Sequence, residues 1–261
     1  MRNDELLEEF EAAALAAGRS ILEFYRRNPV VKEKADHSPV TEADERAERI
    51  ILQYLTKIAP DIPVIAEEEV ARGNVRTIGD RFILVDALDG TREFIAQRPE
   101  FTVNIALVHE GAPVLGVVYA PAQAVAYCGS SAGAWKLGIG ADFKVTERSR
   151  IFVRHAPPAP VALASRSHGS LQTQEYLQRH EITEIRRLGS SLKFCLLAEG
   201  LADLYPRFGR TMEWDTAAGD AVLRAAGGRT RTLDGAPLAY GKTARSDQPD
   251  FANPDFIASG G

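Results

Sequence analysis

Two aspartates, Asp86 and Asp89, end an apolar run in the stretch LVDALDGTREF at residues 84–94. Carboxylates this close repel each other and lose hydration when the chain packs around them, so they need a compensating cation. Gly90 can take a positive φ, and the amides of Gly90 and Thr91 open a short predicted helix, TREFI, whose N–H groups favour an anion. Carboxylates for a hard cation then lie beside amides for an anion, as a metal-assisted phosphate site requires. An acidic turn in which an aspartate caps a helix would give the same pattern.

Two further acidic stretches occupy comparable positions. AEEE places Glu67, Glu68 and Glu69 directly after the strand-like run PVIA. EWDTAAGD places Asp215 at the start of a helix rich in Ala and Gly, whose small residues let the backbone pack closely. Either stretch alone is more often a solvated acid or a helix cap. Their shared place at strand and helix ends, where α/β enzymes build sites, favours a functional interpretation.

Periodicity predicts the elements that precede these acids. Apolar residues recur every three or four positions across residues 6–22, which predicts a helix capped by Asn3 that ends near Tyr25. The extended stretch VVKEK and a turn at DHSP, residues 36–39, then lead to a second amphipathic helix over residues 41–59.

The pattern then changes to short β-type runs, namely PVIA, RFILVD, FTVNIALV, PVLGVVYA and AVAYC. Two helices followed by strands predict an α/β fold of α+β layers with an antiparallel sheet. The best candidate linker is HAPPAP at residues 155–160. Beyond it, strand-like VALAS, ITEIRRL and ADLYPR alternate with helices near residues 170–180, from Ser190 and from Asp215, as in a doubly wound unit.

Two parts are therefore expected along the chain. Residues 1–154 would form an N-terminal α+β metal-binding part with the antiparallel sheet. Residues 155–261 would form a C-terminal α/β part that completes the metal and substrate site.

Composition and charge narrow the class of partner. The chain has 261 residues, 45 % hydrophobic and 26 % charged, which is ordinary for a globular protein. Its net charge of -5 comes from dispersed basic and acidic residues, so nucleic-acid binding is not expected and a small molecule is the expected partner.

Cys128 and Cys195 are predicted to be buried thiols of a reducing compartment. The acidic N-terminal stretch lacks signal-peptide features and no run reaches the ~18 apolar residues of a membrane span, which predicts a cytoplasmic protein. Peripheral membrane association and the oligomeric state stay open.

The order AEE, DALDGT and WDTAAGD resembles the lithium-sensitive, magnesium-dependent family of sugar and nucleotide phosphatases that includes inositol monophosphatase. The resemblance extends over nearly the whole chain, because KADHSPVTEAD is similar to the family's upstream element. It implies the family's five-layered α-β-α-β-α sandwich and a phosphatase that uses two or three Mg²⁺ ions. The chain departs from the family at Ala87, where proline is usual, but this change removes no ligand.

The resemblance also assigns roles to individual residues. The implied metal ligands are oxygen atoms, from Glu67, Asp86 and the Leu88 carbonyl for one Mg²⁺ and from Asp86, Asp89 and Asp215 for a second. Glu68 would contact a third, weaker metal through water. Gly90 and Thr91 would donate backbone N–H groups to the phosphate, and Asp44 would accept from the Thr91 hydroxyl so that it orients the attacking water. The implied catalytic residues are Asp44, Glu67 and Thr91.

Within the family, EFIAQRPEFTVNIAL and TMEWDTAAG look most like the 3′(2′),5′-bisphosphate nucleotidases of the CysQ type. This branch implies removal of the 3′-phosphate of adenosine 3′,5′-bisphosphate, giving AMP and phosphate, in sulfate assimilation or nucleotide recycling. Ser190 and Lys193 in GSSLKFC would then face the 5′-phosphate, with Arg207 nearby, although charge alone favours a solvated helix face and strand end. Two alternatives stay open, an inositol or other sugar monophosphatase and a nucleotide-binding module without turnover.

The histidines lack the spacing of metal ligands, and we assign them no chemistry. Ser165, Ser167 and His168 in ASRSHG do not indicate a hydrolase triad, because GxSxG is absent. We expect SRSHG to form a strand-end loop at the substrate cleft, as in related nucleotidases.

Overall fold

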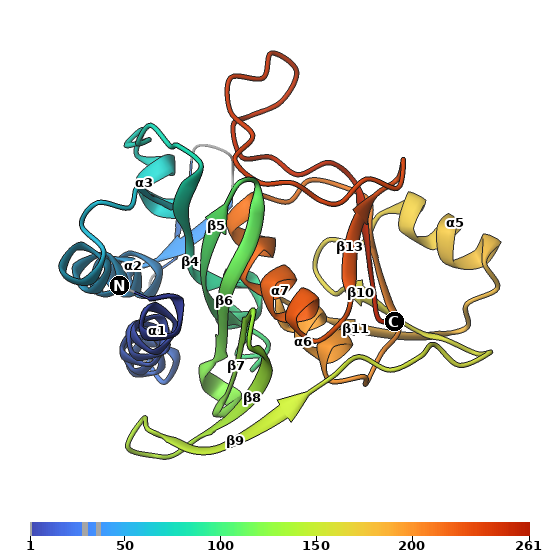
Figure 1. The fold of residues 1–261 in the computed structure, drawn as a ribbon, viewed down its shortest axis with the longest axis horizontal. Helices are drawn as coiled ribbons and strands as arrows, with labels where there is room; N and C mark the ends of the chain where they lie inside the picture. The colour runs from blue at the N-terminus through green and yellow to red at the C-terminus, as the bar shows by residue number, and fades with distance from the viewer. Residues whose placement is uncertain (1, 28–30, 35–37) are drawn as a thin grey trace.

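Two large β-sheets, separated and flanked by helices, form the body of the described part of the protein (Figure 1). This computed structural model describes residues 2–27, 31–34 and 38–261, so the first part of the turn predicted at 36–39 lies outside the described residues. The layers follow one another as helices α1 (Asn3–Tyr25) and α2 (Glu42–Ile58), a seven-stranded sheet, helices α6 (Leu192–Ala198) and α7 (Glu213–Ala225), a five-stranded sheet and helix α5 (Leu171–Arg179). The predicted five-layered α-β-α-β-α sandwich is confirmed.

The larger sheet is almost entirely antiparallel. Its strands in order are β3 (Val64–Ala66), β4 (Arg81–Asp89), β5 (Thr102–His109), β6 (Ala112–Ala120), β7 (Val125–Ser130), β8 (Gly133–Ile139) and β9 (Val145–Ile151). The pairing of β3 with β4 is parallel, and the other neighbours pair antiparallel. The predicted antiparallel sheet is therefore confirmed. The sequence pattern does not indicate β9, because this edge strand is exposed at every position except Ile151.

The smaller sheet is mixed. Its strands in order are β11 (Glu184–Leu188), β10 (Val161–Ser165), β12 (Leu204–Arg207), β14 (Phe256–Ser259) and β13 (Arg229–Thr232). β10 is parallel to both β11 and β12, as a doubly wound unit requires. β14 pairs antiparallel with both β12 and β13, so the doubly wound prediction is wrong for this half of the sheet. RTRT and FIAS are too short to indicate their pairing from local sequence.

α1 and α2 cover the outer face of the larger sheet because each buries one apolar stripe. The predicted cap of α1 is wrong, since Asn3 is the first helical residue and the Glu5 carboxylate accepts the Arg2 backbone N–H at 3.0 Å. α2 begins as predicted, with Thr41 as its cap. The Asp44 carboxylate accepts the Thr41 backbone N–H at 2.8 Å, which fixes Asp44 in the first turn.

α7 lies between the two sheets, and small residues permit its close approach. It packs against β4, β5, β6 and β7 on one side and contacts β13 on the other. Gly116 in β6 leaves no room for a side chain, because a Cβ there would lie 2.3 Å from the Ala218 carbonyl oxygen of α7. The close packing expected of the Ala/Gly-rich stretch is confirmed, and it fixes the helix that begins with EWD.

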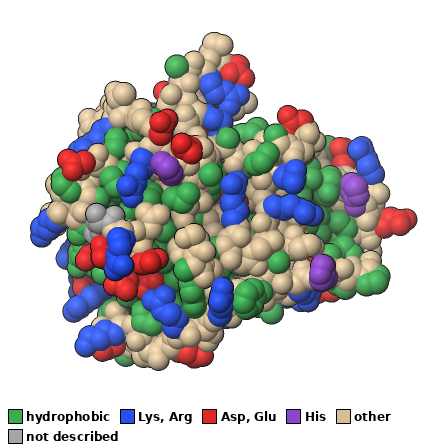
Figure 2. All heavy atoms as spheres, viewed as in Figure 1, with side chains coloured by type: hydrophobic (Ala, Val, Ile, Leu, Met, Phe, Trp, Pro, Cys, Tyr) green, Lys and Arg blue, Asp and Glu red, His purple; other side chains and the backbone are tan. Residues whose placement is uncertain are grey.

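Short elements complete the chain, namely β1 (Val31–Glu33) paired antiparallel with β2 (Pro39–Thr41), α3 (Glu67–Ala71), α4 (Thr91–Ile95) and the 3₁₀ turn η1 (Pro121–Gln123). Cys128 and Cys195 are buried and unpaired. Figure 2 shows basic and acidic side chains interspersed over one face of the molecule, in line with the dispersed charge of the sequence. Among the described residues, no helix has the length and apolar character needed to span a bilayer.

Candidate active site

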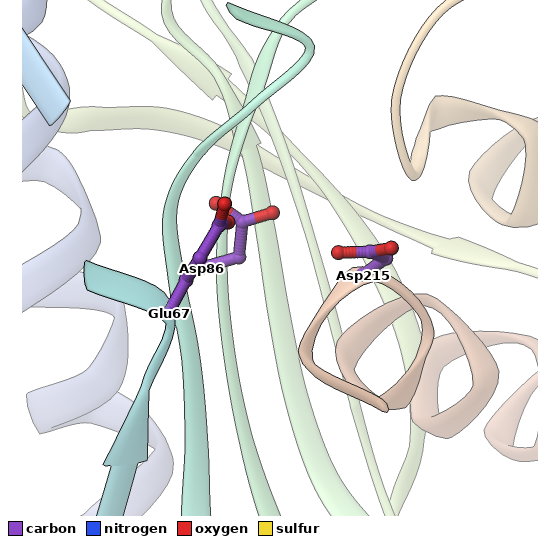
Figure 3. A group of neighbouring side chains, drawn as sticks. All are labelled: Glu67, Asp86 and Asp215. Carbon is purple, nitrogen blue, oxygen red and sulfur yellow. The ribbon is translucent and has the colours of Figure 1, made fainter. Parts of the chain in front are cut away.

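Three carboxylates from different elements converge on one space (Figure 3). Glu67 follows β3 at the start of α3, Asp86 lies in β4 and Asp215 lies in the first turn of α7. Each offers one oxygen atom, and these oxygens all lie within 4.8 Å of one another. The fold therefore brings together the three acidic stretches that the sequence analysis singled out.

Burial and mutual repulsion make this group costly without a cation. The pKa of Asp86 is well above its ordinary value, because burial and the negative charges of Glu67 and Asp89 disfavour the ionised form. The pKa of Asp215 is also well above its ordinary value, owing to burial and then to Asp89 and Glu67. Clustered carboxylate oxygens suit a hard divalent cation, so the donor set fits Mg²⁺.

Asp89 lies beside this group and is oriented by hydrogen bonds to one of its oxygens. Its Oδ2 accepts from the Ser191 backbone N–H at 2.6 Å, the Ser191 hydroxyl at 3.0 Å and the Asn104 amide at 3.3 Å. The Ser191 hydroxyl also lies 2.5 Å from the Asp215 carbonyl oxygen. Ser191 and Asn104 are not among the residues predicted from the sequence. Asn104 has a signal, since it is the one polar side chain within the apolar run VNIALV.

The strand that carries both aspartates ends in the turn of the DALDGT stretch. β4 continues past Asp86 to Asp89 with a register shift between them, so the strand is longer than the predicted RFILVD run. Gly90 then has φ 93° and ψ 40°, a left-handed conformation that favours glycine. The predicted TREFI helix follows as α4.

Thr91, the first residue of α4, contacts two of the other candidate residues. Its hydroxyl donates to Asp44 Oδ1 at 3.0 Å and lies 3.3 Å from the Leu88 carbonyl oxygen. Asp44 Oδ2 accepts from the Thr41 hydroxyl at 2.7 Å. Burial raises the pKa of Asp44 to about 6. The fold thus joins the start of α2 to the start of α4 at this site.

A lysine that the sequence analysis missed contacts the acidic group. Lys34 Nζ lies 2.7 Å from Glu67 Oε1 and 2.5 Å from Glu68 Oε1. Burial and the charge of Glu67 raise the pKa of Glu68 to about 7, and Lys34 acts in the opposite direction. Behind it, the buried Glu48 accepts the Glu68 backbone N–H at 2.8 Å. KEK gives no local signal for Lys34, because such charged runs are usually solvated.

Two buried cations line the same cleft, which has a volume of about 770 Å³. Lys193 is 4 % exposed and Arg207 is 7 % exposed, so the interpretation of a solvated helix face and strand end is wrong. Lys193 Nζ donates to the Ser190 carbonyl at 2.5 Å, and the Arg207 guanidinium donates to the His168 and Arg210 carbonyls at 2.9 Å each. Burial lowers the pKa of Lys193 to about 8.

The loops beside these cations also reach the cleft. Ser190 lines it and has φ 51°, so α6 begins at Leu192 rather than at the predicted Ser190. Ser165 and His168 line the cleft as well, where the SRSHG loop is expected.

Known proteins resemble the chain over nearly its whole length. The model of the inositol monophosphatase family matches residues 2–256. The 3′(2′),5′-bisphosphate nucleotidase CysQ of Shigella flexneri is 46 % identical over 256 residues, which are 97 % of this chain and 99 % of that protein. The protein of the same name from Salmonella typhimurium is 45 % identical over 253 residues, 96 % of this chain and 98 % of that protein.

Solved structures show the same architecture. CysQ from Bacteroides thetaiotaomicron has a TM-score of 0.80 at 38 % identity, with 99 % of this chain and 98 % of that chain covered. An IMPase from Thermotoga maritima has a TM-score of 0.77 at 26 % identity, with 98 % of this chain and 92 % of that chain covered.

Proposed function

The chain belongs to the inositol monophosphatase family, and from this premise we propose that it is a 3′(2′),5′-bisphosphate nucleotidase. It would remove the 3′-phosphate of adenosine 3′,5′-bisphosphate and release AMP and phosphate. One observation favours a bisphosphate nucleotide over a sugar monophosphate as the substrate. The cleft that holds the carboxylates is also lined by the buried cations Lys193 and Arg207, so it offers a second place for an anion.

Enzymes of this family depend on a metal, typically Mg²⁺. We propose that the ligands are Glu67, Asp86 and the Leu88 carbonyl for one ion and Asp86, Asp89 and Asp215 for a second. Glu68 would contact a third ion through water. Bound Mg²⁺ would neutralise phosphate charge and lower the pKa of coordinated water.

The protein's own groups position the reacting atoms. Because the Thr91 hydroxyl donates a hydrogen bond to Asp44, its oxygen can accept a hydrogen bond from the attacking water and hold that water in place. The backbone N–H groups of Gly90 and Thr91 would bind oxygens of the scissile phosphate. Ser190, Lys193 and Arg207 would bind the 5′-phosphate.

A phosphate-release panel with one purified sample tests this function. Adenosine 3′,5′-bisphosphate, inositol 1-phosphate and fructose 1,6-bisphosphate are compared at equal concentration in excess Mg²⁺, with a chelator-treated sample as the control. We expect the bisphosphate nucleotide to have the highest kcat/KM and the chelator to abolish turnover. A preference for inositol 1-phosphate would make the protein a sugar monophosphatase. Binding of the nucleotide without phosphate release would make it a binding module.

A further inference from the structure

Glu93 is a buried carboxylate that the proposed catalysis does not use. It lies in α4 two residues after Thr91, is 3 % exposed and lines the cleft. On one side the Ser167 hydroxyl donates to Glu93 Oε1. On the other side its stem packs against Gly189, where a Cβ would lie 2.7 Å from Glu93 Cγ. Glu93 therefore contacts two loops, residues 166–169 and residues 189–191.

Each of these loops holds one of the two buried cations through a backbone carbonyl. His168, next to Ser167, accepts from Arg207 at 2.9 Å. Ser190, next to Gly189, accepts from Lys193 at 2.5 Å. A shift of either loop would move the cation that the loop holds.

A second link joins the same loops nearer the surface. Glu100 pairs with Arg166 at 2.6 Å and accepts the Gly189 backbone N–H at 3.3 Å. The Arg166 and Glu100 side chains are 35 % and 21 % exposed, and partly solvated ion pairs hold geometry weakly. Glu93 is the buried link, and its close packing against Gly189 leaves little freedom to the loop.

We propose that Glu93 is a positioning residue that sets the spacing of Lys193 and Arg207, and with it the preference for a substrate that carries a second phosphate. The proposal rests on the nucleotidase function above. Arg and Lys recognise phosphate by directed hydrogen bonds, so their placement decides how much each bond contributes. The positioning role requires only the volume and an acceptor oxygen of Glu93, and glutamine supplies both.

The test compares Glu93→Ala with Glu93→Gln on two substrates, adenosine 3′,5′-bisphosphate and adenosine 3′-monophosphate. Glu93→Ala should lower the ratio of their kcat/KM values by roughly tenfold, because one or both cations lose alignment with the second phosphate. The loss should be in KM for the bisphosphate, with its kcat and the values for the monophosphate nearly unchanged. Glu93→Gln should retain the wild-type ratio, and Glu175→Ala, an exposed change on α5, is the matched control.

A wild type that does not prefer the bisphosphate would refute the proposed function itself and remove the premise of this inference. A wild type that prefers it, together with an unchanged ratio in Glu93→Ala or an equal loss on both substrates, would overturn the role of Glu93 alone. Thermal unfolding shows whether Glu93→Ala is folded. If it is not, Ser167→Ala removes the donor to Glu93 at a half-buried position and must lower the same ratio for the proposal to stand.

Discussion

The Thr91 hydroxyl donates to Asp44 at 3.0 Å and so joins the first turns of two helices whose residues are 47 positions apart in the chain. Asp44 is itself held by the Thr41 backbone N–H and hydroxyl, so the acceptor has a fixed orientation. A hydroxyl has one proton to donate and two lone pairs. Donation to Asp44 therefore leaves the Thr91 lone pairs available to accept a hydrogen bond, as the proposed positioning of the attacking water requires.

Thr91→Val tests this arrangement, because valine has nearly the shape of threonine without the hydroxyl. We expect kcat to fall by about 10²-fold or more, since the attacking water loses its acceptor, with a small change in KM. Thr91→Ser keeps the hydroxyl and should stay close to wild type. Steady-state kinetics on adenosine 3′,5′-bisphosphate decides, and near-normal kcat in Thr91→Val would remove Thr91 from the mechanism.

Asp86→Asn separates the contribution of this carboxylate to turnover from its effect on the stability of the metal-free protein. Turnover should fall at least ~10²-fold, a loss of roughly 3 kcal/mol of transition-state stabilisation. In excess chelator the same variant should unfold at a temperature about 2–4 °C above that of wild type. An uncharged amide then replaces a buried carboxylate whose ionised form burial, Glu67 and Asp89 disfavour. Calorimetric titration with Mg²⁺ should show weaker binding. Full activity of the wild type in chelator would end the metal hypothesis.

Lys34→Met tests how the metal-free site is held together. Lys34 contacts both Glu67 and Glu68, so its loss should lower the free energy of unfolding in chelator by roughly 1–3 kcal/mol. Added Mg²⁺ should then raise the unfolding temperature by more in the variant than in wild type, because the metal supplies the missing positive charge. Equal increments in the two proteins would show that Lys34 and the metal do not share these carboxylates.

Gly116→Ala probes the packing that positions α7. The new methyl group would press on the Ala218 carbonyl, and overpacking of this kind costs about 1–3 kcal/mol of stability. Gly79→Ala is the control, since nothing lies within 4 Å of a Cβ there. Thermal unfolding of both variants measures the difference, and equal unfolding temperatures would mean that β6 and α7 move apart without cost.

The sequence reveals the acids of the site because their signals are local. Asp86 ends the apolar run FILV and Asp215 lies in the first turn of a helix, and each pattern is visible within ten residues. For Asp215 the helix-capping interpretation is confirmed, since its Oδ2 accepts the Met212 backbone N–H at 2.8 Å, and its carboxylate also belongs to the acidic group that we propose as the metal site. The two alternatives are compatible because a carboxylate has two oxygens.

The residues that sequence reasoning misses act through contacts between distant segments. Lys34 meets Glu67 from 33 positions away, and Ser191 meets Asp89 from 102 positions away. Nothing in the neighbourhood of Lys34 or Ser191 distinguishes it from a solvated charge or a turn serine. The same reason hides the pairing of β13 with β14, which depends on the order of the sheet rather than on the two short strands themselves.

Titration of Lys193 should make kcat/KM depend on pH, but only for a substrate that carries two phosphates. Burial lowers the pKa of Lys193 to about 8, although the negative charge of Asp89 acts in the opposite direction. A lysine is positive below its pKa and neutral above it, so kcat/KM for adenosine 3′,5′-bisphosphate should fall as the pH rises through about 8. Adenosine 3′-monophosphate should lack this alkaline decline, because it places no phosphate near Lys193.

The variants Lys193→Ala and Lys193→Arg complete the test of that decline. At neutral pH, Lys193→Ala should lower kcat/KM for the bisphosphate by roughly ten- to a hundredfold, the worth of one charge-assisted bond, and the alkaline decline should disappear. Lys193→Arg stays charged at every accessible pH, so whatever activity it retains should show no decline near pH 8. The profiles are measured with both substrates in saturating Mg²⁺ at constant ionic strength. A decline shared by both substrates, or one that persists in Lys193→Ala, would assign the titration to another group. Lys193 would then not be the group that binds the second phosphate.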